Sequence, residues 1–264
     1  LVRPGTRELL DAALSQGADV VGGLDPAIFE GNVEAHLDVV FGLAERHGKS
    51  IDLHLHEGGH LGLHTLGRIA ERTRASGMQG RVVASHAYAL GEVPLDAMLP
   101  TAEKLAKAGV AIMTNAPGDH PFPPVLALRE AGVTVFAGND DIRDSWWPYG
   151  DGDMLERAMM IGYRSGFYTD DELLCAFDLA TAAPAKVLGL ADYGLRVGAS
   201  ADMIVLDADH AQMAVVARPM ACSSASRATP DRRVRPHSIY RETGGCGHRS
   251  RLFCIAGTFG RSDR

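Results

Sequence analysis

Short apolar runs alternate along the first 140 residues with longer stretches in which apolar residues recur at helical spacing. Short runs rich in Val, Ile and Ala are typical of strands buried in a parallel sheet. The pattern therefore predicts five such strands. They cover residues 18–23, 50–56, 81–86, 110–115 and 133–140.

Helical periodicity fills the intervals between these runs and continues after them. The predicted helices cover residues 6–15, 30–47, 61–75, 95–108, 125–131, 153–165 and 170–182. Glycine stands just before the next strand at several of these helix ends (Gly17, Gly48, Gly109 and Gly132), as is typical of helix termini. Strand starts recur every 23 to 32 residues, which is the period of a βα unit. We expect an α/β fold built around a parallel sheet.

The C-terminal fifth of the chain breaks the pattern. Residues 198–207 read as a turn that leads into a strand, but residues 220–264 show no sustained period. Residues 211–264 hold ten Arg, no Lys and three acids, a net charge of +7, whereas residues 1–210 carry −14. We expect 211–264 to be an irregular Arg-rich tail, disordered or translated from a shifted reading frame.

Composition excludes several classes of protein. No run of 18 apolar residues occurs, so we expect no membrane span. The acidic body argues against nucleic acid as a partner. The four cysteines include no CxxC pair, which favours a reducing cytoplasm over a disulfide-stabilised secreted fold. A small molecule is the expected partner, and self-association stays open.

Polar residues gather where the predicted strands end, which in parallel α/β folds is where chemistry is carried out. They are His54, His56, Glu57, Ser85, His86, Asn115, Asn139, Asp140 and Asp141. Any one of them alone is more often an ordinary strand-to-loop residue. Agreement between three strands, with residue types that bind metals, favours an active site.

Imidazole and carboxylate groups on separate strands suit one divalent Zn or Fe ion. His54, His86 and Asp140 are the candidate ligands, and Glu57 is placed for acid–base chemistry beside a metal-activated water. Trp146 follows Asp140 closely and could stack on a flat ring. His60, His64 and His120 have no strand-end placement, and we interpret them as surface or supporting residues.

In combination these motifs resemble the cytosine deaminase branch of the metal-dependent amidohydrolase superfamily. The similarity spans about residues 1–210. It rests on Ile51–Glu57 (IDLHLHE), Ala84-Ser85-His86, Asp140-Asp141, Asp144–Gly150 (DSWWPYG), Ala185–Leu190, Tyr193-Gly194 and Gly198–Leu206.

The resemblance implies a role for each site residue. His54 would bind the metal, and Glu57 would protonate a ring nitrogen. His86 would orient the attacking hydroxide, and Asp140 would be both metal ligand and proton shuttle. Trp146 and Asp141 would bind substrate. His56 stands at a position that varies within the family, so we expect it to support the metal ligands rather than to bind the ion.

The resemblance also implies an incomplete (β/α)8 TIM barrel. Only three predicted strands follow residues 50–56 up to Asp140, so 50–56 fits strand five, and the chain would hold strands four to eight. Residues 1–196 would then form the partial barrel, and 197–210 a strand of a flanking β-sandwich. Strands one to three, including an HxH pair of metal ligands, would lie outside the sequence. We therefore expect this chain alone to be inactive or poorly metallated.

The implied reaction is hydrolytic deamination of a small nitrogen heterocycle such as cytosine. Two alternatives stay open. Residues 138–144 and 149–154 suit equally well an amidohydrolase of the N-isopropylammelide type, which releases an alkylamine from an s-triazine. The other alternative is a truncated product with no catalytic function.

Overall fold

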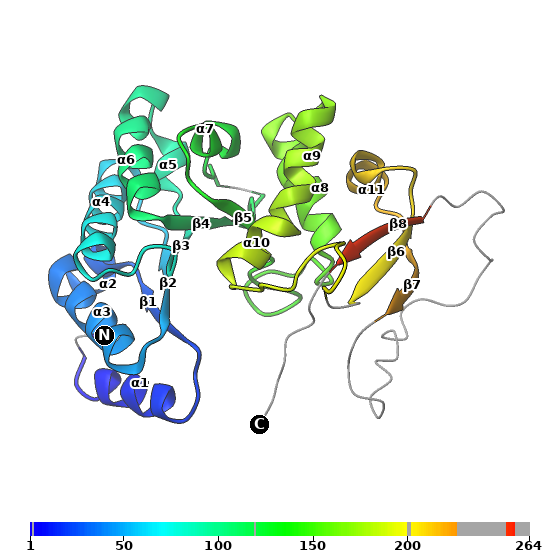
Figure 1. Cartoon of the computed structure of the whole chain (residues 1–264). Coiled ribbons are helices and arrows are strands. Elements are labelled where there is room, and N and C mark those ends of the chain that lie inside the picture. The colour runs from blue at the N-terminus through cyan, green and yellow to red at the C-terminus, as the bar shows by residue number, and fades with distance from the viewer. Residues whose placement is uncertain (2, 119, 200–201, 226–251, 257–264) are drawn as a thin grey trace. The chain divides into compact units, whose positions relative to one another are not determined.

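The computed structural model describes residues 1, 3–118, 120–199, 202–225 and 252–256. The chain divides into two compact units, Leu1–Gly152 and Asp153–Arg264. Both are shown in Figure 1.

A five-stranded parallel sheet forms the centre of the first unit, with the strands in the order β1-β2-β3-β4-β5. Sequential order in a parallel sheet is what consecutive βα units of a barrel produce. The predicted parallel α/β architecture is confirmed, and each strand falls within or beside its predicted range. The strands are β1 (Val20–Leu24), β2 (Ser50–Leu55), β3 (Val82–His86), β4 (Val110–Thr114) and β5 (Val135–Ala137).

Helices follow each strand, and α3, α4 and α6 lie along the same side of the sheet (Figure 1). Left-handed glycines end α3 at Gly48 and α6 at Gly109, as the sequence predicts. The helices of this unit are α1 (Thr6–Ser15), α2 (Pro26–Glu30), α3 (Val33–His47), α4 (Gly59–Ala75), α5 (Ala89–Glu92), α6 (Leu95–Ala108) and α7 (Val125–Glu130).

The two faces of β2 differ sharply in burial. Ile51, Leu53 and Leu55 are fully buried, whereas Asp52 and His54, which alternate with them, are only partly buried. Because side chains alternate along a strand, the apolar residues share one face, which fixes the polar residues on the other. The core under the helices continues through residues of α3, α4 and β4, including Leu37, Leu66 and Ile112.

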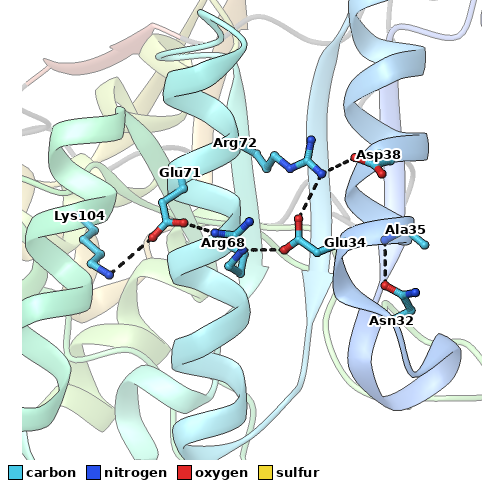
Figure 2. Close-up of polar contacts among 8 residues, drawn as sticks. All are labelled: Asn32, Glu34, Ala35, Asp38, Arg68, Glu71, Arg72 and Lys104. Atoms are coloured by element: carbon cyan, nitrogen blue, oxygen red, sulfur yellow. Dashed lines mark hydrogen bonds and ion pairs between the residues drawn. The ribbon is translucent and has the colours of Figure 1, made fainter.

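A chain of ion pairs ties three helices together on the outside of the unit (Figure 2). Arg68 Nε of α4 donates to Glu34 Oε1 of α3 at 2.6 Å, and Arg72 Nη2 donates to Glu34 Oε2 at 3.1 Å. On the other side of α4, Glu71 contacts Lys104 of α6 at 3.8 Å. These pairs connect neighbouring βα units through their helices.

The second unit is built from helices and a small antiparallel sheet of order β7-β6-β8. Leu155, Leu206 and Ala214 share one buried cluster with Phe177 packed against it. The elements are α8 (Met154–Ser165), α9 (Asp170–Leu179), α10 (Ala182–Val187), β6 (Met203–Asp207), α11 (Ala211–Ala217), β7 (Ala221–Ala225) and β8 (Leu252–Ala256).

The compact units and the elements of the C-terminal segment are bounded differently from the expected segments, whose domain assignment stays a prediction. The compact division lies after Gly152 rather than at 196, because Leu155 of α8 packs in one cluster with Leu206 of β6. Residues 211–264 are not uniformly irregular: α11, β7 and β8 fall inside this range. The strands form there because β6 supplies backbone partners on both of its edges. The expected disorder elsewhere in the tail lies outside the described residues. No helix of the described part is long and apolar enough to cross a membrane.

We predict that Gly23→Ala destabilises the first unit. A Cβ at Gly23 of β1 would overlap the imidazole of His36 and the side chain of Leu53, both in the core. Overpacking of this kind costs about 1–3 kcal/mol. Gly42→Ala in α3 is the matched control, because nothing lies within 4 Å of its added Cβ and alanine favours a helix. Urea unfolding measures both; equal midpoints for the two variants would contradict the packing argument.

We also predict that the helix ion pairs weaken in acid. Arg68, hydrogen-bonded to the Glu34 carboxylate, lowers the pKa of Glu34 from 4.5 to about 2. Because the pKa of Glu34 is lower in the folded state, the ionised carboxylate stabilises the folded state fully above pH 4.5. This stabilisation is lost as the pH falls towards 2 and the carboxylate is protonated. Because Glu34 is 44% exposed, solvent limits the contribution to about 0.2–1 kcal/mol.

The measurement is the pH dependence of unfolding for Arg68→Gln against the unchanged chain. The free energy of unfolding of the Arg68 variant should depend less on pH between 4.5 and 2 than that of the unchanged chain. Arg74→Gln removes the same charge from α4, and Arg74 makes no ion pair in the described part of the chain. Identical pH profiles for all three proteins would refute the role of the network.

Candidate metal centre

The carboxyl ends of the parallel strands bring His54, His86 and Asp140 together. His54 comes from the end of β2, His86 ends β3, and Asp140 follows β5. One ligand atom from each lies within 4.8 Å of the others. His54 Nε2 is 3.9 Å from Asp140 Oδ1, and His86 Nε2 is 3.7 Å from the same oxygen. Two imidazoles and a carboxylate around a common point form a donor set suited to a divalent transition metal.

The buried imidazole of His86 supports this interpretation. The residue is 1% exposed, and neither ring nitrogen makes a hydrogen bond of normal geometry in the described part of the chain. Buried polar atoms rarely lack partners in native proteins. Burial lowers the pKa of His86 to about 4, so the ring is neutral at pH 7, as a metal ligand must be. The residues present therefore fit a bound cation.

Asp140 and His54 influence each other electrostatically. The Asp140 carboxylate raises the pKa of His54, and His54 in turn lowers the pKa of Asp140. Asn115, which follows β4, donates from Nδ2 to Asp140 Oδ2 at 3.1 Å. This bond occupies one carboxylate oxygen and leaves Oδ1 beside the two histidines. The sequence pattern placed Asn115 at a strand end without giving it this role.

The backbone at these strand ends is strained. Asp25, His86, Ala87, Ala116 and Asp140 all have positive φ, between 38° and 69°, and all lie just after or at the end of a strand. Residues other than glycine rarely adopt this conformation, at a cost of about 1–2 kcal/mol each. Such strain clusters at functional sites, where the fold enforces it.

Glu57 lies next to the cluster in sequence, but its carboxylate is engaged elsewhere. The residue is fully buried. Its Oε1 accepts hydrogen bonds from the backbone N–H groups of Ala27 at 2.5 Å and Ile28 at 3.4 Å, and its Oε2 accepts one from Thr65. Here Glu57 joins β2 to the start of α2 and to α4, and it is outside the group of three candidate ligands. Its role as an acid stays a prediction.

His56 belongs to a group of stacked rings beside the candidate ligands. Its imidazole stacks on that of His86 with centroids 4.6 Å apart and lies 6.0 Å from that of His54. Tyr88 lies 5.5 Å from both His56 and His86 and stacks on His120 at 5.2 Å. The sequence did not indicate Tyr88 and His120 as site residues. His120 lies in the loop after β4, and only tertiary packing brings it against the ring of Tyr88.

The expected substrate residues lie in the loop after β5. Trp146 is 83% exposed, and its backbone N–H donates to Asp144 Oδ1 at 2.9 Å. Its neighbour Trp147 packs edge-on against Tyr149 at 5.6 Å. Burial and the nearby Asp144 raise the pKa of Asp141. Substrate binding by Trp146 and Asp141 stays a prediction.

Comparison with known proteins agrees with this geometry. The Amidohydrolase family profile matches residues 1–225. N-isopropylammelide isopropyl amidohydrolase of Pseudomonas sp. (strain ADP) is 36% identical over 212 residues, 80% of this chain and 53% of the relative. The crystal structure of N-isopropylammelide isopropylaminohydrolase from Burkholderia multivorans ATCC 17616 is 48% identical with a TM-score of 0.83, and it covers 86% of this chain.

A second type of relative is also similar. The crystal structure of 5-methylcytosine deaminase from Klebsiella pneumoniae, liganded with 5-fluorocytosine, is 28% identical with a TM-score of 0.75 over 83% of this chain. The present chain spans 58% of the Burkholderia protein's length and 57% of the Klebsiella protein's.

We predict that Asp140→Asn weakens metal binding by about tenfold or more, because it removes the only negative charge of the ligand cluster. Asp141→Asn is the matched control, since it removes the same charge one residue away from the cluster. Titration with Co²⁺, followed by its visible absorption and by metal analysis, measures both. Affinity should also fall in acid, because protons compete for His54, whose pKa is raised. Equal affinities of the two variants would exclude Asp140 as a ligand.

Proposed function

Because this chain belongs to the amidohydrolase family, we propose that it acts in the hydrolytic release of an exocyclic amine from a small, flat nitrogen heterocycle. The observation that carries the proposal is the convergence of His54, His86 and Asp140 at the carboxyl edge of the sheet. The neutral, buried His86 supports it, since that ring has the state a ligand needs.

A divalent Zn or Fe ion held by His54, His86 and Asp140 would supply Lewis-acid activation of water at neutral pH. Asp140 would take up a proton from the attacking water, and Asn115 would keep the carboxylate in place through its hydrogen bond to Oδ2. The water oxygen bonds to the ring carbon that bears the amine. By resemblance, His86 would instead hold the attacking oxygen beside Asp140, and His54 and Asp140 alone would then bind the ion.

Collapse of the tetrahedral carbon would break its bond to the exocyclic nitrogen. The proton held by Asp140 would leave on the amine, and the hydroxyl proton would pass to Glu57 in place of the one given to the ring nitrogen. The products are an oxo-heterocycle and ammonia or an alkylamine. We assign protonation of the ring nitrogen to Glu57 by resemblance. For this, Glu57 must exchange its hydrogen bonds with Ala27 and Thr65 for one to substrate.

Two substrate classes compete within this proposal. The 48% identity to the Burkholderia N-isopropylammelide enzyme supports an s-triazine that loses an alkylamine. The 28% identity to the Klebsiella deaminase gives weaker support to cytosine and its relatives. We therefore place the s-triazine first, reversing the order that the sequence motifs suggested.

The test is amine release from N-isopropylammelide, cytosine, isocytosine and creatinine, with Zn²⁺ or Fe²⁺ added. It should be run on the protein expressed from its own gene and, in parallel, on residues 1–264 alone. We expect N-isopropylammelide to be turned over fastest by the former and little turnover by the latter. Absence of amine release from every compound would refute the proposal.

Glu57→Gln should slow turnover by about 10²–10⁴-fold, the range for loss of a general acid. Glu45→Gln, an exposed acid of α3, is the control and should leave the rate unchanged. Thermal unfolding of both variants separates chemistry from folding, because Glu57 also holds α2. A loss below tenfold in a folded Glu57 variant would exclude its role as the acid.

A further inference from the structure

Asp25, which the sequence motifs did not single out, lies beside the site residues His56 and Glu57. It follows β1 and is only 3% exposed. Its Oδ1 accepts hydrogen bonds from the backbone N–H groups of His56 at 2.5 Å and Glu57 at 3.2 Å. Its Oδ2 lies 2.8 Å from His56 Nδ1. One buried carboxylate therefore fixes both the backbone and the ring of His56.

These bonds determine which nitrogen of His56 carries the proton. An ionised carboxylate only accepts hydrogen bonds, so Nδ1 must be the donor, and in the neutral ring Nε2 is then an acceptor. Burial alone would raise the pKa of Asp25, but the hydrogen bonds from His56 outweigh it and the pKa is lowered. Asp25 is therefore ionised at neutral pH.

The His56 ring is bound to the buried Asp25 through Nδ1, which leaves Nε2 on another edge of the ring. The His56 side chain is 38% exposed, whereas that of Asp25 is 4% exposed. Since Nδ1 is bound to the buried carboxylate, Nε2 lies on the side of the ring away from it. That ring stacks on the candidate ligand His86.

We propose that Asp25 positions His56 so that its Nε2 accepts a hydrogen bond from a ring N–H of the substrate. His56 is then a specificity-determining contact, and Asp25 is a positioning residue. The inference rests on the proposed function for the kind of substrate, a flat heterocycle with ring N–H groups next to oxo groups. An N-alkylated ring cannot satisfy the acceptor and is rejected, because a desolvated acceptor left unpaired weakens binding.

The first experiment determines the tautomer of His56 by ¹⁵N NMR of the imidazole nitrogens in the 264-residue chain. We expect the proton on Nδ1. Asp25→Asn should reverse this: the amide oxygen replaces Oδ1 on the two backbone N–H groups, and the amide NH₂ donates to Nδ1. Asp19→Asn is the control, since Asp19 precedes β1 and its side chain is 91% exposed. A proton on Nε2 in the unchanged chain would overturn the positioning role.

The second experiment measures binding of 1,3,5-triazine-2,4,6-trione, which has three ring N–H groups, and of its tri-N-methyl derivative, which has none. Calorimetry with and without Zn²⁺ should show the N–H ligand bound at least tenfold more tightly. Asp25→Asn should remove this preference, and Asp19→Asn should retain it.

The results also separate this inference from the proposed function. Equal binding of the two triones by the unchanged chain, or binding of neither, would overturn the contact with His56. The contact would also be overturned if the Asp25→Asn variant, with the His56 proton moved to Nε2, still preferred the trione that carries N–H groups. Failure of the amine-release assay alone would refute the reaction but leave the tautomer and the N–H preference measurable.

Discussion

The register of β2 in the parallel sheet is the constraint on which the site depends. Leu55 pairs with His86 across β2 and β3, and Ile51, Leu53 and Leu55 are fully buried. A slip of one residue would turn these three side chains to the other face and put His54 into the apolar core. Burial of three large aliphatic side chains therefore fixes the imidazole of His54 beside Asp140.

Rigidity beyond the register comes from the turns after the strands. His86 and Asp140 keep a left-handed backbone although neither is glycine, and Asn115 holds the Asp140 carboxylate from β4. The surrounding packing must offset the cost of this strain. A cation site gains from it, because ligands that are already in place lose little conformational freedom when the metal binds.

The chemistry of the site depends as much on what each residue is hydrogen-bonded to as on its identity. His54, His56 and His86 lie within one group of rings, yet their environments differ. His86 is buried and neutral, the pKa of His54 is raised by Asp140, and His56 is bound to Asp25. This arrangement gives three similar side chains three different electrostatic environments.

The sequence by itself determined the βα units and the parallel sheet, and it placed His54, His86 and Asp140 at strand ends, because these follow from local periodicity and from residue type. It did not reveal Asp25, Tyr88 or His120, nor the hydrogen bonds that hold Glu57 at α2. Those contacts join segments about 30 residues apart in sequence, and no local pattern encodes such a distance. The pairing of β6 with β7 and β8 was likewise decided by tertiary structure, since strands in an Arg-rich segment become stable only when a neighbouring edge supplies backbone partners.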